Sequence, residues 1–190
     1  MKKLLSMIMA ILTCSCFFVP ANAMENRADE IINKNVLVAE IPMELEAAEA
    51  IFEEPCQLQA EDVQEVGDFI VVNRFYETGE SIERANVHTA GAMSAVTWYR
   101  RGSSSWTYKM QLAAWFEYDG SRATCTDTDV TAVDASYNNV AGDSATIFKH
   151  GDIASARTGI NIPKDNLHAT LEVSCTKDGE LDYTSENKYF

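Results

Sequence analysis

The sequence predicts an all-β fold, an antiparallel β-sandwich of the Ig-like or a related kind with about seven or eight strands. Residues 106–118 alternate apolar and polar side chains with the period of two that is typical of a half-buried strand. Asp119-Gly120 and Asp178-Gly179, each placed after such a segment, are strong signals for hairpin turns. No Gly-rich strand–helix unit interrupts these segments, so we do not expect a parallel α/β sheet.

Further short segments have the alternation and the length of strands, and turn residues separate them. The apolar face of the segment that begins at Trp106 runs from that residue to Tyr118, and is expected to face the core. The predicted strands are 69–77, 81–89, 92–100, 106–118, 122–130, 145–149, 153–162, 167–176 and 180–185.

Residues 1–23 have the pattern of a secretory signal peptide: a positive start, an apolar run over 4–19, and the small-x-small end Ala-Asn-Ala at 21–23. The apolar run is shorter than the ~20 residues that a membrane-spanning helix needs. A retained anchor is therefore disfavoured. A lipoprotein signal is a second alternative because Cys14 and Cys16 lie in the run, but the residues before them fit a lipidation box poorly. We expect a cleaved chain that is secreted.

Charge divides the expected mature chain, 24–190, into two parts. The chain has 13 basic and 29 acidic residues after cleavage, a net charge of −16, which disfavours nucleic acid and anionic membrane surfaces as partners. Residues 24–66 hold 12 of the acidic groups, only two basic groups, and Phe52 as the only aromatic residue. This shift predicts an acidic leader or pro-segment over 24–66 and a β-sandwich domain over 67–190, with the boundary near Gly67.

Within the acidic segment, residues 40–54 read as one amphipathic helix. Apolar residues recur at helical spacing from Ile41 to Phe52, Pro42 suits the first turn and Pro55 ends the helix. A helix of about four turns is marginal alone in water. Either it packs on the following domain or the segment is largely disordered, and the composition favours the disordered interpretation.

Three cysteines remain after cleavage: Cys56, Cys125 and Cys175. Cys125 and Cys175 lie on the inward phase of their strands, so we predict a disulfide between them in an oxidising compartment. Two buried free thiols are the alternative. Cys56 is left over in the acidic segment, where it is free to link two copies of the chain, to stay a thiol, or to replace one of the other two cysteines.

Two short motifs carry a resemblance to known sequences. Residues 118–126 read Tyr-Asp-Gly-Ser-Arg-Ala-Thr-Cys-Thr, and residues 173–179 read Val-Ser-Cys-Thr-Lys-Asp-Gly. Over about residues 106–179 the chain resembles small uncharacterised secreted β-sandwich proteins of gut-type Gram-positive bacteria. In these an aromatic strand ends in a Tyr-x-Gly hairpin, and a Thr-Cys on each of two strands suggests a bridge. The resemblance implies a fold and an extracellular location, and no activity.

The residue types that commonly carry out catalysis or bind metals are scattered along the sequence and form no recognised motif. His88, His150 and His168 lie far apart, and no metal-binding His spacing or Gly-x-Ser-x-Gly elbow is present. Asp127 and Asp129 precede Asp134 without the glycine and terminal glutamate of a calcium loop. We therefore expect no catalytic residues, no metal and no cofactor.

One group of residues is typical of recognition. Trp98, Tyr99, Arg100 and Arg101 precede a short Ser-rich turn, and Trp106 follows it. Exposed aromatic and arginine side chains are enriched where proteins bind other proteins. The alternative is that both tryptophans are core residues of adjacent strands.

These observations favour a secreted, non-catalytic binding protein that acts on a host or bacterial surface protein or glycan. A toxin or bacteriocin-like effector, kept inactive by its acidic pro-segment, is the second hypothesis. A hydrolase is the third and least favoured, because it needs converging acids, or a histidine beside one, in an open cleft.

Overall fold

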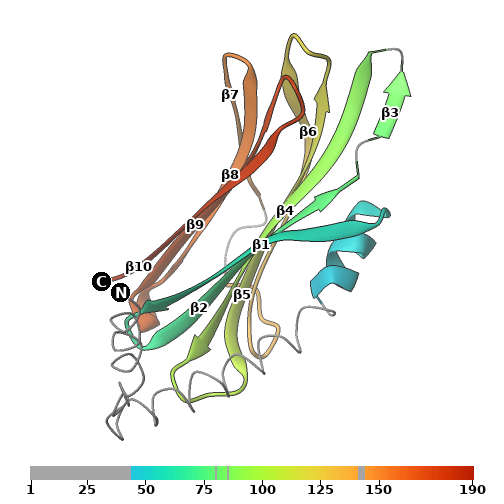
Figure 1. The fold of residues 1–190 in the computed structure, drawn as a ribbon. Coiled ribbons are helices and arrows are strands. Elements are labelled where there is room, and N and C mark those ends of the chain that lie inside the picture. The colour runs from blue at the N-terminus through green and yellow to red at the C-terminus, as the bar shows by residue number, and fades with distance from the viewer. Residues whose placement is uncertain (1–43, 80, 85, 141–143) are drawn as a thin grey trace, which may run out of the picture. The chain divides into compact units, whose positions relative to one another are not determined.

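The computed structural model describes residues 44–79, 81–84, 86–140 and 144–190, and it places two antiparallel sheets face to face (Figure 1). Sheet A contains β1 (Cys56–Val66), β2 (Phe69–Thr78), β3 (Ser81–Arg84), β4 (Val87–Arg100), β5 (Trp106–Tyr118) and β6 (Ala123–Asp134). Sheet B contains β7 (Thr146–His150), β8 (Ile153–Ile162), β9 (Leu167–Thr176) and β10 (Leu181–Tyr189). A single 3-10 turn, η1 (Pro163–Asp165), connects β8 to β9.

The strand order is β1-β2-β4-β5-β6 in sheet A, with β3 paired to β4, and β10-β9-β8-β7 in sheet B. All pairs are antiparallel. The predicted all-β antiparallel sandwich is confirmed. The predicted bounds of 106–118, 153–162 and 167–176 agree with β5, β8 and β9.

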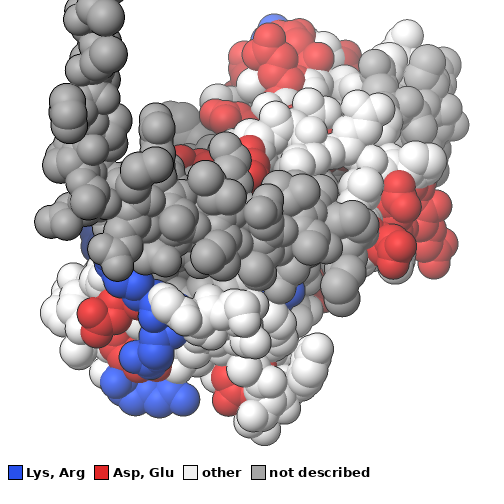
Figure 2. Space-filling view, turned by 60° about the horizontal axis from the view of Figure 1, so that its bottom comes forward, with Lys and Arg blue, Asp and Glu red and all other residues white. Residues whose placement is uncertain are grey.

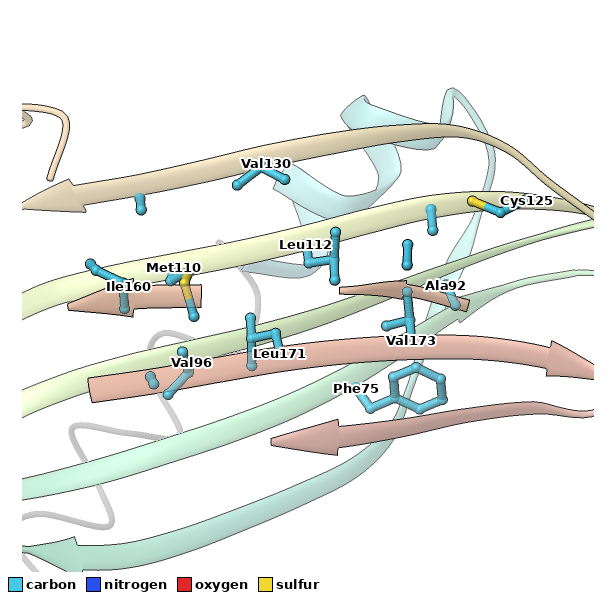
Figure 3. Packing of buried hydrophobic residues seen from close by; sticks show 14 of the residues in the cluster. Phe75, Ala92, Val96, Met110, Leu112, Cys125, Val130, Ile160, Leu171 and Val173 are labelled. Carbon is cyan, nitrogen blue, oxygen red and sulfur yellow. The ribbon is translucent and has the colours of Figure 1, made fainter. Parts of the chain in front are cut away.

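The core lies between the two sheets, where the alternating residues predicted to face inward meet (Figure 3). Side chains such as Leu112 of β5 and Leu171 of β9 are fully buried there. Phe75 of β2 stacks on Tyr183 of β10, with ring centroids 4.6 Å apart. Apolar burial of this kind contributes roughly 25 cal/mol per Å², so this interface is the main source of stability in the sandwich.

The two Asp-Gly hairpins also join the sheets at one end. Gly120, in the β5–β6 turn, and Gly179, in the β9–β10 turn, both have positive φ, as the hairpin signals require. The backbone N–H of Gly120 donates to the carbonyl of Lys177 at 2.9 Å, so one turn is bonded to the other. Each turn therefore closes its own hairpin, and the hydrogen bond between the turns connects sheet A to sheet B at this end.

A second layer covers the face of sheet A that points away from sheet B (Figure 1). It is a helix over residues 44–52, within the predicted range 40–54. Ala48 and Phe52 are buried against Tyr76, Met93 and other side chains of the outer face. The helix packs on the sandwich, so the favoured disordered interpretation was wrong for this part of the leader.

The domain boundary predicted near Gly67 was also wrong. β1 occupies Cys56–Val66 and pairs with β2 along its length, so Gly67 lies in the turn of a hairpin. The solvent-facing residues of this edge strand are mostly charged or polar, and that composition resembled a leader rather than a strand. The predicted signal peptide 1–23 and residues 24–43 lie outside the described residues.

Candidate recognition site

Trp106 lies on the outer face of sheet A, although simple alternation along its strand predicts an inward position. Trp98 is paired with Tyr108, and Tyr99 with Trp106, so Thr107 is an extra residue in β5. Such a bulge shifts the alternation by one and re-aims the side chain before it. The bulged Thr107 carbonyl accepts a hydrogen bond from the N–H of Ala135 at 3.0 Å. The bulge therefore joins Trp106 to the turn that follows β6.

The turn that follows β6 places the side chain of Tyr137 on the surface. The Asp134 carboxylate accepts hydrogen bonds from the N–H groups of Ser136 (2.9 Å) and Asn138 (3.0 Å). The Asn138 side chain donates to the same carboxylate, and these bonds hold the pKa of Asp134 below its usual value. Tyr137 has a φ of 60° and is 78% exposed. A bulky residue in the left-handed region is rare, and strain of this kind clusters at functional sites.

Trp106, Tyr137 and Lys109 together form what we call the aromatic corner. The Trp106 and Tyr137 rings meet edge-on, at an interplanar angle of 82° and a centroid distance of 5.6 Å. Nζ of Lys109 lies 5.0 Å from the Trp106 centroid, within range of a cation–π interaction. Sequence reasoning identified Trp106 and missed both other members. The Asp-x-x-Tyr-Asn run at 134–138 was a turn signal that could have located Tyr137.

Of the other predicted recognition residues, Tyr99 borders this corner. Trp98 is in the inter-sheet core, whereas Tyr99 is buried on the outer face of sheet A, directly across the strand pair from Trp106. Arg100 donates to Asp165 of η1 at 2.8 Å, and Arg101 donates to Glu65 of β1 at 3.0 Å.

Figure 2 turns toward the viewer the end of the molecule that lies at the bottom of Figure 1. It shows basic side chains gathered in one area with acidic side chains between them. Arg100 and Arg101 each form an ion pair, with Asp165 and with Glu65 respectively. The two arginines therefore tie the end of β4 and the turn after it to η1 and to β1. Trp106 is the member of the predicted group that forms the aromatic corner, and Tyr99 lies beside it.

Beside the aromatic corner, a buried carboxylate is held by the outer face of sheet A. Oε2 of Glu44 accepts hydrogen bonds from Nη1 of Arg74 (2.7 Å) and the hydroxyl of Tyr76 (3.2 Å). Oε1 accepts a hydrogen bond from Thr97 (3.1 Å) and lies 3.9 Å from Nζ of Lys109. We call Arg74, Tyr76, Thr97 and Lys109 the carboxylate cradle.

Glu44 and Arg74 of this site are buried and oppositely charged. Arg74 is 1% exposed and Glu44 is 4% exposed. Burial lowers the pKa of Arg74, but the carboxylates of Glu44 and Glu61 outweigh it and the net shift is upward. Burial, and then the charge of Glu44, raise the pKa of Tyr76, so its hydroxyl stays protonated and donates. Breaking such a pair is costly because it leaves one charge buried without compensation.

The predicted Cys125–Cys175 disulfide is not present; both residues are free thiols. They lie in the core on β6 and β9, in facing sheets. Two inward cysteines are therefore not sufficient for a bond, because a disulfide also needs a particular Cα separation and direction of the two Cβ atoms. Burial raises the pKa of both thiols to about 11, and the proximity of Cys125 adds to the shift at Cys175.

Cys56 is also a buried thiol, at the start of β1. Its sulfur donates to the carbonyl of Glu54 at 3.6 Å, and burial raises its pKa to about 11. A link between two copies through Cys56, one of the sequence-based predictions, would require this strand end to open.

The three histidines occupy separate places. His88 stacks on Tyr118 with centroids 5.3 Å apart, His168 lies near Phe190, and His150 ends β7. Among residues 44–190, apart from the gaps at 80, 85 and 141–143, no group of three or more His, Cys, Asp or Glu side chains could hold a metal ion. In the same part of the chain, no helix has the length and apolar character needed to cross a membrane.

Comparisons of the chain with models of known families, with curated proteins and with solved structures found no match.

The state of the cysteines leads to a direct prediction. In the native protein at neutral pH, we expect a thiol reagent to react slowly with Cys56, Cys125 and Cys175, because the reactive thiolate is scarce at a pKa of about 11. After unfolding in guanidinium chloride without reductant, all three should react. The measurement is a thiol titration with intact mass; a single reacting thiol in the unfolded chain would contradict the free-thiol assignment.

Proposed function

We propose that this chain is an exported, non-catalytic binding protein that recognises another protein outside the cell through the aromatic corner. The observation that carries the proposal is Tyr137, which is 78% exposed and is held against Trp106 by the Asp134 turn. Tyrosine and tryptophan supply large contact areas at low entropic cost, and they dominate binding hot spots. A ring that is already ordered loses little freedom on binding.

The shape of the corner favours a protein partner over a glycan. The two rings meet edge-on at 82°, so they do not form one flat surface on which a sugar ring would stack. Lys109 adds a positive charge beside the Trp106 ring in a chain with a net charge of −14. An acidic or aromatic side chain of the partner fits these two features.

Export is supported by the signal-peptide pattern at 1–23. Burial of Cys56, Cys125 and Cys175 limits the access of oxidants to the three free thiols.

The second candidate function is that of a secreted effector whose acidic pro-segment is removed by cleavage at an internal site. One observation favours it: Glu53, Glu54 and Pro55 are exposed between the helix and β1. N-terminal sequencing of the secreted protein distinguishes the two functions. A start at Met24 is expected for the binding protein, and a start within 53–56 would indicate the effector. Cleavage near Gly67 is not expected, because it would remove the paired strand β1.

The corner is tested with two variants that each remove an exposed aromatic ring. Tyr137→Ser removes the corner ring, and Phe190→Ser removes a ring that is 73% exposed at the C-terminus. The mature chains are immobilised and incubated with bacterial envelope and host mucosal extracts. We expect wild type and Phe190→Ser to retain the same protein, and Tyr137→Ser to retain at least tenfold less, which corresponds to the loss of about 1.4 kcal/mol of binding free energy.

Treatment of the extracts identifies the partner class. Protease treatment should abolish retention, and periodate oxidation of glycans should leave it unchanged. Protease-resistant, periodate-sensitive retention would assign a glycan and contradict the protein partner. Equal retention by wild type and Tyr137→Ser would contradict the aromatic corner as the binding site.

A further inference from the structure

We infer that the hollow beside Phe52 and Trp115 binds the quaternary ammonium group of a small organic cation. The hollow lies at the C-terminal end of helix 44–52, and the helix stays in place as one of its walls. The inference goes beyond the proposed function, because it concerns a separate site and does not depend on Tyr137. It follows from the walls of the hollow, from its size and from the charges that line it.

Two aromatic rings form part of the walls of this site, which we call the Trp115 hollow. Phe52 comes from the helix and Trp115 from β5, and their rings meet edge-on with centroids 4.9 Å apart. Phe52 is buried, whereas Trp115 is only half-buried, so part of its indole surface is open. The face of an aromatic ring attracts a cation, and indole does so most strongly. The open part of Trp115 is therefore suited to contact with a cation.

The backbone of β4 fixes the positions of both rings. Gly91 is the direct cross-strand partner of Trp115, and an added Cβ at Gly91 would come within 2.6 Å of the Phe52 ring. The absence of a side chain there lets Phe52 lie directly on the strand. The N–H of Gly91 donates to the hydroxyl of Thr78 at 2.8 Å, which holds the next strand in place. The walls are already ordered, so binding loses little conformational freedom.

A β-bulge also lies at the Trp115 hollow. Trp115 pairs with Asp127, and Phe116 pairs with Cys125, so Thr126 is an extra residue in β6. Thr126 lines the hollow, and its hydroxyl donates to the carbonyl of Trp115 at 3.2 Å. Bulges are over-represented next to functional sites, where they re-aim a side chain. The irregularity of β6 therefore coincides with the place where the hollow opens.

The size of the hollow limits the ligand to one small group. Its volume is about 150 Å³, and it is half-open to solvent. An apolar cavity of about this volume holds a benzene molecule, and a trimethylammonium group is similar in size. The open side leaves the rest of a ligand in solvent. The site is therefore suited to the head group of a small molecule.

The charges of the lining residues identify the ligand as a cation. The described residues that line the hollow include two carboxylates, Glu54 and Glu117, and no lysine or arginine. Both side chains are exposed, and neither forms an ion pair within the described part of the chain. A cation in the hollow is attracted by both carboxylates, whereas an anion is repelled. The net charge of −14 adds an attraction at longer range.

A quaternary ammonium suits the hollow better than a primary ammonium does. The hydroxyl of Thr78 accepts from Gly91 and donates to the carbonyl of Gly79, and the hydroxyl of Thr126 donates to the carbonyl of Trp115. These two hydroxyls are therefore already bonded to the backbone. A primary ammonium gives up hydrogen bonds to water when it enters such a site, whereas a quaternary ammonium has no N–H to leave unsatisfied. Aromatic rings and opposite charge are the means by which proteins recognise quaternary ammonium groups.

The test titrates the isotope-labelled mature chain with choline. The readout is the indole N–H resonance of Trp115, identified by its loss in Trp115→Phe. The matched ligand is the uncharged isostere of choline, in which a tert-butyl group replaces the trimethylammonium group. We expect a saturable shift with choline, and at least tenfold weaker binding of the isostere, because the isostere fills the same volume without the charge.

Three glutamine substitutions test the carboxylates. Glu54→Gln and Glu117→Gln should each weaken choline binding about threefold, as expected for exposed charge pairs. Glu53→Gln is the matched control, because it removes the same charge from an exposed neighbour that does not line the hollow, and it should leave the affinity unchanged. Tyr137→Ser should bind choline as wild type does. A failure of the aromatic corner is in this way distinguished from a failure of the Trp115 hollow.

Four results would overturn the inference. The first is the absence of a saturable shift at Trp115 in the folded chain. The second is equal affinity for choline and its uncharged isostere, since apolar contact alone would then explain binding. The third is an equal loss of affinity in Glu53→Gln and Glu54→Gln, since the effect would then come from net charge. The fourth is tighter binding of N-acetyl-lysine amide than of choline, since a lysine side chain of a partner protein would then be the occupant.

Discussion

The structure depends on how the outer face of sheet A is covered. A sandwich needs one apolar face on each sheet, but here the second face of sheet A also buries Tyr76, Met93 and Ala113. It holds a buried arginine among them. Because an isolated charge in such a place is very unfavourable, Arg74 must be paired, and Glu44 and Glu61 pair with it. The ion pair between Arg74 and Glu44 therefore fixes helix 44–52 to the sheet.

The carboxylate cradle and the aromatic corner share one residue. Lys109 lies beside Glu44 in the cradle and over the ring of Trp106 in the aromatic corner. The bulge at Thr107 makes the second contact available, because it turns Trp106 to the same face as Lys109. The outer face of sheet A thus combines an ordered aromatic corner, a carboxylate cradle and an amphipathic helix, all on strands whose inner faces form the core.

The sequence was sufficient for the sandwich because period-two alternation and Asp-Gly turns are local signals, and β5, β8 and β9 have the predicted bounds. It was insufficient where the outcome depends on distant partners. The acidic composition of 24–66 hid β1, because the charge of Glu61 is compensated by Arg74, which lies in another strand. Alternation alone placed Trp106 inward, and one bulged residue reversed it. Two inward cysteines predicted a disulfide, but a bond also depends on where each lies along its strand, which alternation does not give.

The central claim is that Arg74 and Glu44 form one energetic unit, and a double-mutant cycle measures this directly. Arg74→Met should lower the free energy of unfolding in urea by about 3 kcal/mol, since it leaves Glu44 buried without its partner. Adding Glu44→Leu should recover at least half of that loss, because an apolar pair suits the same interface. Strictly additive losses from the two substitutions would contradict the claim and would show that Arg74 and Glu44 contribute to stability independently of each other.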